Sequence, residues 1–530
     1  MVCGFTYYIS GIKTINLTYC NFCFIVIFEI LYTMKLSRRK FIGAGVIGMA
    51  STASSAVKPV EGKINKPIEL CDPNAKPFVF GKEPNRVRKS FYDLTDGEVR
   101  NLCKAIGYMK GSIPIGDPTQ WQSYANIHMK HCTASDATHP QVHWGWHFLP
   151  WHRGYIFFLE RILANILTTK LNIDGTKFAY PFWDWCAHQE IPNTKEREAR
   201  GLASPLFGYD LTQENMVKQD NLGFDNLALF EGNRAPTIQK SKMSPDNEVS
   251  PDSKAHIQEC KNYMSPEYIN LVLTTPWEQF GGKPVTDRAT GQGLMEAGPH
   301  NDGHDWVGMR YGSNRCMGTL RYAAEDPIFF MHHGNIDRVF SLYKNPMPDL
   351  DGPWGQQTYT FTDIDGSPVT VTIKDIMTKM TSTISYAVPS DNNLTPPSGP
   401  SSSIPRVAQH INYKIKPKDG LTLEIKSEFI KDVSKSKAAI LEIETGHLLH
   451  SGKGYIKAYI NNKYIGRVKI LNGDPSTSDT SVTHSFVMVV GNLGKLSEFI
   501  TPNDKFYLTL SSYGFKNEVL VRTIRLHALN

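Results

Sequence analysis

The chain has 530 residues, of which 41% are hydrophobic and 20% charged, and its formal net charge is +6 at pH 7. This length allows two or three domains with a large core, and this composition is typical of a globular protein rather than a disordered one. Residues 1–56 hold most of the net positive charge, so the remainder has no basic excess that would favour nucleic acid or an anionic membrane, and the nine scattered cysteines lack zinc-finger spacing.

The first 56 residues resemble a targeting segment. Arg38 and Arg39 precede a mildly apolar run rich in Gly and Ala, and small residues follow up to Ala56. This order resembles a twin-arginine export signal, which predicts a periplasmic or secreted protein whose translation starts at Met34. A basic turn before a short helix is the competing interpretation. The apolar run 22–31 is too short to span a membrane, so we expect no stable membrane anchor.

Residues 89–170 are predicted to be mostly helical. Apolar residues recur at helical spacing within 90–111, and Asp93 or Thr95 is a suitable N-cap. Pro150 is placed as the first residue of a further helix, where proline is favoured. A segment rich in Asn, Pro and Gly, 190–270, is expected to form long loops with short helices.

After residue 345 the pattern changes from helical to alternating. Residues 358–362 and 369–373 alternate like strands, and further short strands follow the Pro- and Ser-rich segment 389–405. These features predict a C-terminal β-sandwich behind a mainly α core. The expected parts are an N-terminal extension 1–56, a core 57–345, a small β-containing extension 346–388, a linker 389–405 and the sandwich 406–530.

Histidines are the strongest chemical signal. His300 and His304 are four residues apart, so on a helix both rings face the same way and can bind one ion, and His332 or His333 can complete the set. Imidazole-only sites suit copper or zinc, less often iron or nickel. Most such pairs are ordinary core or surface histidines, and the pair alone does not identify a site.

Earlier in the chain, His143 and His152 are nine residues apart. On one continuous helix they would point in opposite directions, so both reach one metal only if His143 lies on a loop before the helix. His128 and Cys132 are four residues apart, with His131 as a competing partner.

Two longer motifs resemble a known family. His143 followed by Phe-Leu-Pro-Trp-His152-Arg resembles the copper A signature of type-3 copper proteins, namely tyrosinases, catechol oxidases and molluscan haemocyanins. Asp-Pro-Ile-Phe-Phe-Met-His-His333-Gly-Asn-Ile-Asp337 resembles their copper B signature. The motif around His128 is similar to that of plant polyphenol oxidases. The resemblance covers roughly residues 89–388.

This resemblance implies two copper ions in a four-helix bundle. It assigns three ligands to each ion, which are His128, His143 and His152 for copper A and His300, His304 and His333 for copper B. His131, His147 and His332 would then lie behind the ligands or at the surface. Asp337 either fixes a ligand ring or forms an ion pair with Arg338 or another base.

Cys132 matches the cysteine that forms a thioether with the second copper A histidine, here His143, in many relatives. A buried thiol is the alternative. Glu296 and Asn301 match the acid and amide that in tyrosinases are thought to hold a proton-accepting water, so the resemblance implies hydroxylation of monophenols as well as oxidation of o-diphenols. A helix-end acid and a turn residue are their ordinary alternatives.

Asp305 and Leu320 fall at positions expected to influence which substrates enter. The expected partners are small phenols and O2, and no nucleic acid. A reversible oxygen carrier of haemocyanin type is the alternative function, and a zinc hydrolase built on His300 and His304 would leave the copper A signature unexplained. The C-terminal domain resembles the part that covers the active site of latent plant enzymes; passive stabilisation is the alternative.

Overall fold

The computed structural model describes residues 72, 74–133, 142–190, 192–200, 204, 229, 258–285, 289–308, 316–395, 403–416, 420–425, 438–446, 454–470, 483–490, 506–513 and 518–529. The chain divides into two compact units, Met1–Glu61 and Gly62–Asn530. The predicted export signal belongs to the first unit and lies outside the described residues. Among the described residues no helix combines the length and the apolar character that crossing a membrane requires.

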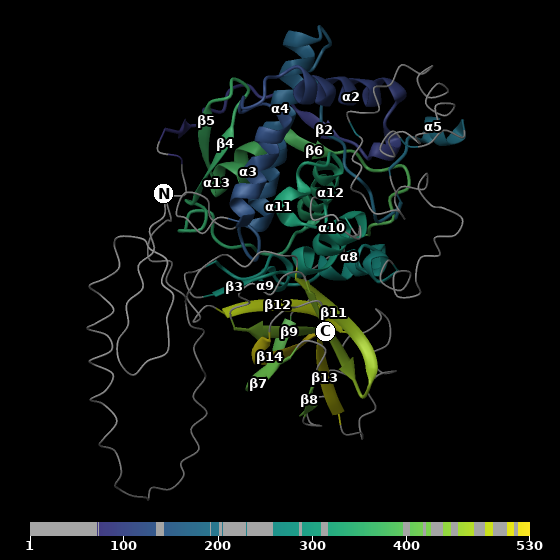
Figure 1. Ribbon diagram of the computed structural model, residues 1–530, viewed down its shortest axis with the longest axis vertical. Helices are drawn as coiled ribbons and strands as arrows, with labels where there is room; N and C mark the ends of the chain where they lie inside the picture. The colour runs from purple at the N-terminus through teal and green to yellow at the C-terminus, as the bar shows by residue number, and fades with distance from the viewer. Residues whose placement is uncertain are drawn as a thin grey trace, which may run out of the picture. The chain divides into compact units, whose positions relative to one another are not determined.

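The first part of the second unit is helical, as predicted (Figure 1). Its longer helices are α2 (Asp96–Gly111), α3 (Trp121–Thr133), α4 (Phe148–Lys170), α10 (Asn301–Gly308) and α12 (Ile328–Leu342). Shorter ones are η1 (Phe91–Asp93), α5 (Lys195–Ala199), α8 (Pro266–Val272), α9 (Trp277–Phe280), η5 (Glu296–His300), α11 (Leu320–Ala323), α13 (Ile373–Asp375), η6 (Ile376–Met380) and η7 (Thr381–Thr383). Helices α4 and α12 pack together through aromatic side chains such as Tyr155 and Phe330, whose rings are 5.2 Å apart.

Local signals explain where two of these helices begin. Thr95 is the N-cap of α2, and its hydroxyl and the Glu98 carboxylate form a reciprocal capping box, which satisfies backbone amides at the helix start. Helix α4 begins at Phe148, two residues before the predicted Pro150. Proline is tolerated there because amides of the first turn have no acceptor within the helix.

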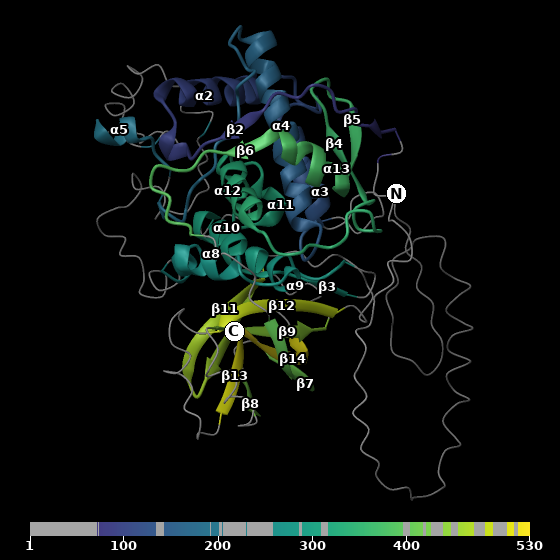
Figure 2. The same ribbon diagram turned by 180° about the vertical axis from the view of Figure 1, so that it is seen from behind.

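Short strands surround the helical bundle. They are β1 (Lys76–Pro77), β2 (Arg86–Arg88), β4 (Thr358–Thr362), β5 (Pro368–Thr372) and β6 (Ile384–Tyr386). Strand β1 pairs with β5, which also pairs with β4, and β2 pairs with β6 (Figure 2). Because β1 and β2 precede the first long helix, the segment after residue 345 is joined to the start of the described chain by sheet hydrogen bonds.

The C-terminal part is a β-sandwich, as predicted. Its strands are β7 (Ser403–Ile415), β8 (Gly420–Ile425), β9 (Ala438–Thr445), β10 (Gly454–Ile460), β11 (Lys463–Ile470), β12 (Thr483–Val490), β13 (Phe506–Tyr513) and β14 (Val519–Leu529). One sheet has the order β11-β10-β13-β8. Side chains of both sheets, among them Ile456 and Phe486, share one apolar core. Strand β7 begins at Ser403, so the last residues of the predicted linker are extended.

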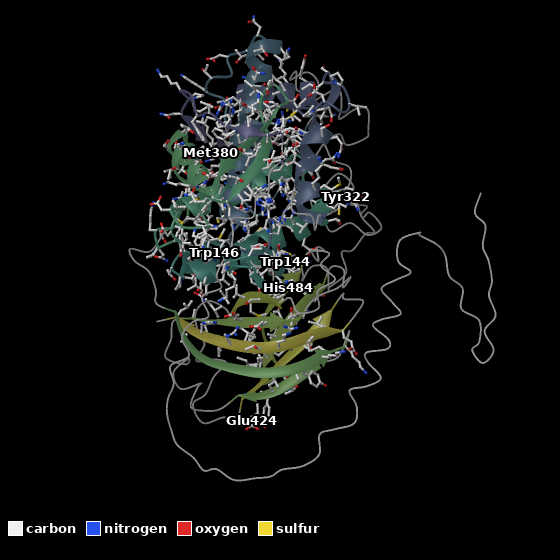
Figure 3. The ribbon with its side chains drawn as sticks, turned by 90° about the vertical axis from the view of Figure 1, so that its left-hand side faces the viewer. Trp144, Trp146, Tyr322, Met380, Glu424 and His484 are labelled. Carbon is white, nitrogen blue, oxygen red and sulfur yellow. The ribbon has the colours of Figure 1, made fainter. Side chains whose placement is uncertain are left out.

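The second sheet has the order β3-β12-β9-β14-β7, and its edge strand β3 (Ala289–Gly291) comes from the helical part of the chain. Trp144 also crosses between the two parts, since its side chain is buried in the core of the sandwich with its ring 4.8 Å from that of His484. Figure 3 labels both residues where helices meet strands. Sandwich and helical part therefore share a strand and an aromatic anchor.

Candidate metal centre

Two groups of three histidines could each hold a metal ion. The first is His128, His143 and His152, and the second is His300, His304 and His333. Within each group, one ligand nitrogen from each residue lies within 4.8 Å of the others, and all six side chains are buried. The structure therefore brings together the two sets that the sequence predicted, and His333 rather than His332 completes the second.

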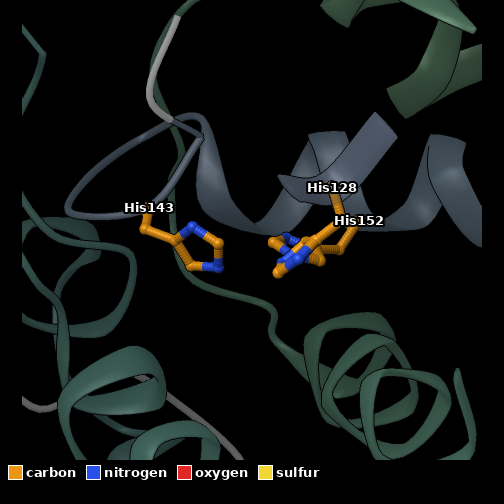
Figure 4. Close-up of side chains that lie close together, drawn as sticks. All are labelled: His128, His143 and His152. Carbon is orange, nitrogen blue, oxygen red and sulfur yellow. The ribbon is translucent and has the colours of Figure 1, made fainter. Parts of the chain in front are cut away.

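Different elements deliver the first group. His128 lies on α3 and His152 in the first turns of α4, while His143 lies on the loop that precedes α4 (Figure 4). The nine-residue spacing between His143 and His152 predicted that His143 lies on a loop before the helix. Within that loop Trp144 has a positive φ of 69°, a strained conformation for a residue with a side chain. Burial of its indole in the sandwich core offsets that strain.

The two groups face each other. His152 and His333 stack with ring centroids 4.1 Å apart, and the rings of His143 and His300 are 5.6 Å apart. Helices α4 and α12 thus present one ligand each across a common centre. This arrangement suits two ions that share a small bound molecule.

Hydrogen bonds set the direction of several rings. Nδ1 of His152 lies 2.8 Å from the Phe148 carbonyl, and Nδ1 of His304 lies 2.9 Å from the Met317 carbonyl. A carbonyl accepts only, so each Nδ1 carries the proton and each Nε2 is left with its lone pair. Nε2 of His152 is buried with no hydrogen-bond partner. Such an orphaned nitrogen fits a metal ligand.

Burial keeps these rings neutral. Desolvation lowers the pKa of His152 to about 3 and, for the same reason, that of His304 to about 4. Neutral imidazole is the form that binds a transition metal. The donor set therefore fits copper, which accepts three imidazoles and keeps an open coordination position.

The other three histidines of this region lie outside both groups. All are buried. His332 has Nε2 3.1 Å from the His300 carbonyl, and His147 has Nδ1 2.5 Å from the Tyr359 hydroxyl. His131 packs its ring 5.0 Å from Trp151. These contacts make them supports behind the ligands.

Cys132 lies beside two predicted copper A ligands. Its Sγ is 3.4 Å from Nε2 of His128 and 3.6 Å from Nδ1 of His143. Both rings are therefore within reach of the sulfur. No disulfide joins the cysteines among the described residues.

Glu296 and Asn301 are linked by a residue that the sequence did not single out. Gln292 donates from Nε2 to Glu296 Oε1 at 3.2 Å and accepts at Oε1 from Asn301 Nδ2, also at 3.2 Å. Glu296 Oε1 further accepts from the Trp144 amide at 2.6 Å, and Oε2 is buried with no hydrogen-bond partner among the described residues. Burial raises the pKa of Glu296 to about 8.

Asn301 has a different set of partners from the one expected. Its Oδ1 is 3.0 Å from Nδ1 of His300, so it accepts the ring proton of a predicted ligand. Its amide hydrogens go to Gln292 and to the Lys469 carbonyl, at 2.8 Å for the latter. Asn301 therefore holds His300 in place, and its amide group is already fully engaged.

The two residues expected to influence substrate entry are both buried. Asp305, next to His304, forms an ion pair with Lys469 of β11. Leu320 contacts Cys132 in a small apolar cluster. The acid thus faces a cation from the sandwich, and the leucine lies beside the first group of ligands.

A buried ion network, not predicted from the sequence, ties the ligand helices together. Arg88 of β2 forms a bidentate pair with Glu160 of α4, with both N–O distances 2.8 Å. Its Nη1 also donates to Asp337 of α12 at 2.8 Å, and Arg153 donates to the same carboxylate at 2.7 Å. Asp337 therefore forms the ion pair that was the alternative to a contact with a ligand ring, with Arg88 and Arg153 as the bases; Arg338 binds Asp184 instead.

Comparison with known proteins agrees with this site. Residues 118–346 match the family model of the common central domain of tyrosinase. A polyphenol oxidase from Vitis vinifera is 30% identical over 308 residues, covering 55% of this chain and 46% of the relative. The (+)-larreatricin hydroxylase of Larrea tridentata is 27% identical over 58% of this chain and 51% of its own length. The names of both relatives describe them as chloroplastic.

Solved structures agree on the fold. A latent aurone synthase, a polyphenol oxidase, superposes with a TM-score of 0.62 at 21% identity, covering 86% of this chain and 92% of the other. Latent apple tyrosinase gives a TM-score of 0.58 at 18% identity, covering 86% and 100%. The chain spans about half the length of the curated relatives it matches. Residues 118–346 therefore match the central domain of tyrosinases, and the two histidine groups within this segment fit the pair of copper ions of type-3 copper proteins.

Proposed function

We propose that this protein oxidises o-diphenols to o-quinones with O2 and also hydroxylates monophenols at the ortho position. The observation that carries the proposal is the pair of buried, all-imidazole groups that face each other with His152 and His333 at 4.1 Å. Two catechols and one O2 give two quinones and two waters, while one monophenol and one O2 give one quinone and one water. When bound, the copper pair supplies the electron exchange with O2.

The residues of the chain hold ligands and move protons. Carbonyls of Phe148 and Met317 orient His152 and His304, and Asn301 orients His300. A monophenol, with a pKa of about 10, must lose its proton before it reacts. In this proposal Glu296 holds, through Oε2, the water that accepts this proton, because its other oxygen is already occupied by the Trp144 amide and Gln292.

We assign small phenols and O2 as the partners. Asp305 and Leu320 are proposed to select among phenols by charge and bulk. For the sandwich we propose a shield over the site, with passive stabilisation as the alternative. Unchanged catechol turnover after a cut in the predicted linker, 389–405, and release of the sandwich refutes the shield.

The proposal also includes a crosslink between two side chains and an export signal. Cys132 and His143 form a thioether, for which the 3.6 Å contact is the support; the denatured, reduced chain should then be two hydrogens lighter than its sequence mass. A twin-arginine signal directs export, and the N-terminal sequence of the exported protein should then lack Arg38 and Arg39.

Oxygen uptake tests the function directly. The copper-loaded protein should consume O2 with a monophenol and with the corresponding catechol. His152→Ala should abolish both rates, whereas His131→Ala, a change of a buried histidine outside the two groups, should retain them. An oxygen carrier would bind O2 without steady turnover, and a zinc hydrolase would take up none. Either result refutes the oxidase.

A further inference from the structure

The strand that leads into the second ligand group belongs to the sheet of the C-terminal sandwich. Strand β3 pairs in parallel with β12, with Thr290 opposite His484 and Gly291 opposite Ser485. The Thr290 hydroxyl lies 2.8 Å from Nδ1 of His484. The next amide, that of Gln292, donates to the Ser485 carbonyl at 2.9 Å. The sandwich thus fixes the backbone at the point where the Gln292 side chain begins.

That side chain connects the two residues proposed to control the phenolic proton and a ligand ring. Gln292 is only 2% exposed. Its amide orientation is determined by its neighbours, because only nitrogen can donate to the Glu296 carboxylate and only oxygen can accept from the Asn301 amide. One side chain therefore sets the distance between acid and amide.

The sandwich holds the other end of the same network. The second hydrogen of Asn301 Nδ2 is donated to the Lys469 carbonyl of β11 at 2.8 Å. Nearby, Arg467 of the same strand forms a buried ion pair with Asp302. Trp144, whose amide binds Glu296, has its indole in the sandwich core. Three separate connections therefore run from the sandwich to the Glu296–Asn301 pair.

We propose that the C-terminal sandwich positions Glu296 and Asn301, with Gln292 as the positioning residue, and that monophenol hydroxylation depends on this contact more than catechol oxidation does. This inference rests on the proposed function. Hydroxylation forms a carbon–oxygen bond after proton removal, so it needs the acid and the ligand ring in a defined geometry. Catechol oxidation makes no new bond to carbon and tolerates a looser arrangement. The sandwich is then part of the active-site framework as well as a cover.

Two variants disturb the contact without changing a predicted ligand. Gln292→Met keeps the bulk of the side chain and removes both hydrogen bonds. Gly291→Ala adds a Cβ that would lie 2.7 Å from Cγ of Lys283 and 3.0 Å from Cβ of Ser485 on β12, so the contact between β3 and β12 has to adjust. Gln357→Met is the matched control, because Gln357 is equally buried at 2% exposure and lies outside this network.

The measurements are O2 uptake with a monophenol and its catechol, and backbone hydrogen exchange of residues 292–304 in copper-free and copper-loaded protein. We expect Gln292→Met and Gly291→Ala to lower the ratio of monophenol to catechol rate roughly tenfold, which corresponds to a difference of about 1.4 kcal/mol between the two barriers. Exchange in 292–304 should quicken in both variants. Gln357→Met should change neither quantity.

An unchanged ratio in both test variants, or an equal change in the control, overturns the inference. If the wild-type protein takes up no O2 with the catechol, the proposed function fails by itself. Hydrogen exchange then tests whether the sandwich positions Glu296 and Asn301. Quicker exchange in both test variants than in the control supports this positioning, and equal exchange refutes it.

Discussion

Replacing Arg88 with methionine should destabilise the protein strongly. The Arg88 guanidinium is completely buried between the copper A helix α4 and the copper B helix α12. It donates to Glu160 through Nε and Nη2 and to Asp337 and the Tyr386 hydroxyl through Nη1, all at 2.8 Å. Methionine fills much of the same space and donates nothing.

The two carboxylates are affected differently. Asp337 keeps Arg153 at 2.7 Å and the Tyr386 hydroxyl at 2.5 Å. Of its hydrogen bonds to described residues, Glu160, whose side chain is 0% exposed, keeps the one from the Tyr180 amide at 2.9 Å, and the charge of Arg86 still acts on it. Leaving one buried charge without its partner costs about 3–5 kcal/mol. We therefore expect a loss of that size from Arg88→Met, with most of it recovered when Glu160→Gln is added.

Urea unfolding measures the free energy that Arg88→Met loses. The protein should be copper-free, because bound metal would add its own binding free energy. Arg161→Met is the control on the same helix, since Arg161 is 13% exposed and its partners Glu83 and Asp363 are 10% and 17% exposed. It should cost less than Arg88→Met, because water still reaches the carboxylates that it leaves. A loss below about 1 kcal/mol for Arg88→Met, or no recovery in the double variant, would refute the assignment of Glu160 as the stranded charge.

Three further results are expected. Because burial raises the pKa of Glu296 from 4.5 to about 8, folded protein holds a proton that unfolded protein releases, so this one group should lower copper-free stability by roughly 2–3 kcal/mol between pH 5 and 7, while the buried histidines, whose pKa values are lowered, raise it over the same range. The Glu296 contribution is the difference in pH dependence between the wild type and Glu296→Gln, and equal pH dependence of the two would contradict it. His333→Ala should lower bound copper from two ions per chain to one, measured by elemental analysis after dialysis, and retention of both would remove His333 from the ligand set. Gly303→Ala should cost about 1–3 kcal/mol, because its Cβ would lie 2.3 Å from the His332 ring; Gly81→Ala, with nothing within 4 Å, is the control, and equal unfolding midpoints would show that the ring can move aside.

The two histidine groups could be predicted because their spacing carries local information. His300 and His304 lie on one face whenever a helix forms, and the loop position of His143 followed from its distance to His152. Thr95 could likewise be recognised as one of two possible caps from its own neighbourhood. Family resemblance then selected His333 over His332, a choice that spacing alone had left open.

The contacts that support the histidines could not be predicted from the sequence in the same way. Arg88 and Asp337 are 249 residues apart, and neither lies in a pattern that marks an ion pair. Gln292 is an ordinary glutamine in a Gly-rich segment, and only the pairing of β3 with β12 shows why its side chain is fixed. Contacts of this kind depend on tertiary structure, so single-sequence patterns contain no signal for them.

The pairing of β3 with β12 also means that cutting the chain and separating its parts are different events. A break between Thr395 and Ser403 would cleave one peptide bond and leave every described contact between the fragments in place. The C-terminal fragment on its own would expose the edge of β12 and the cavity that Trp144 fills, both of which favour aggregation. The nicked protein should therefore behave as a complementing pair of fragments, which elutes as one species until a denaturant releases the shared strand.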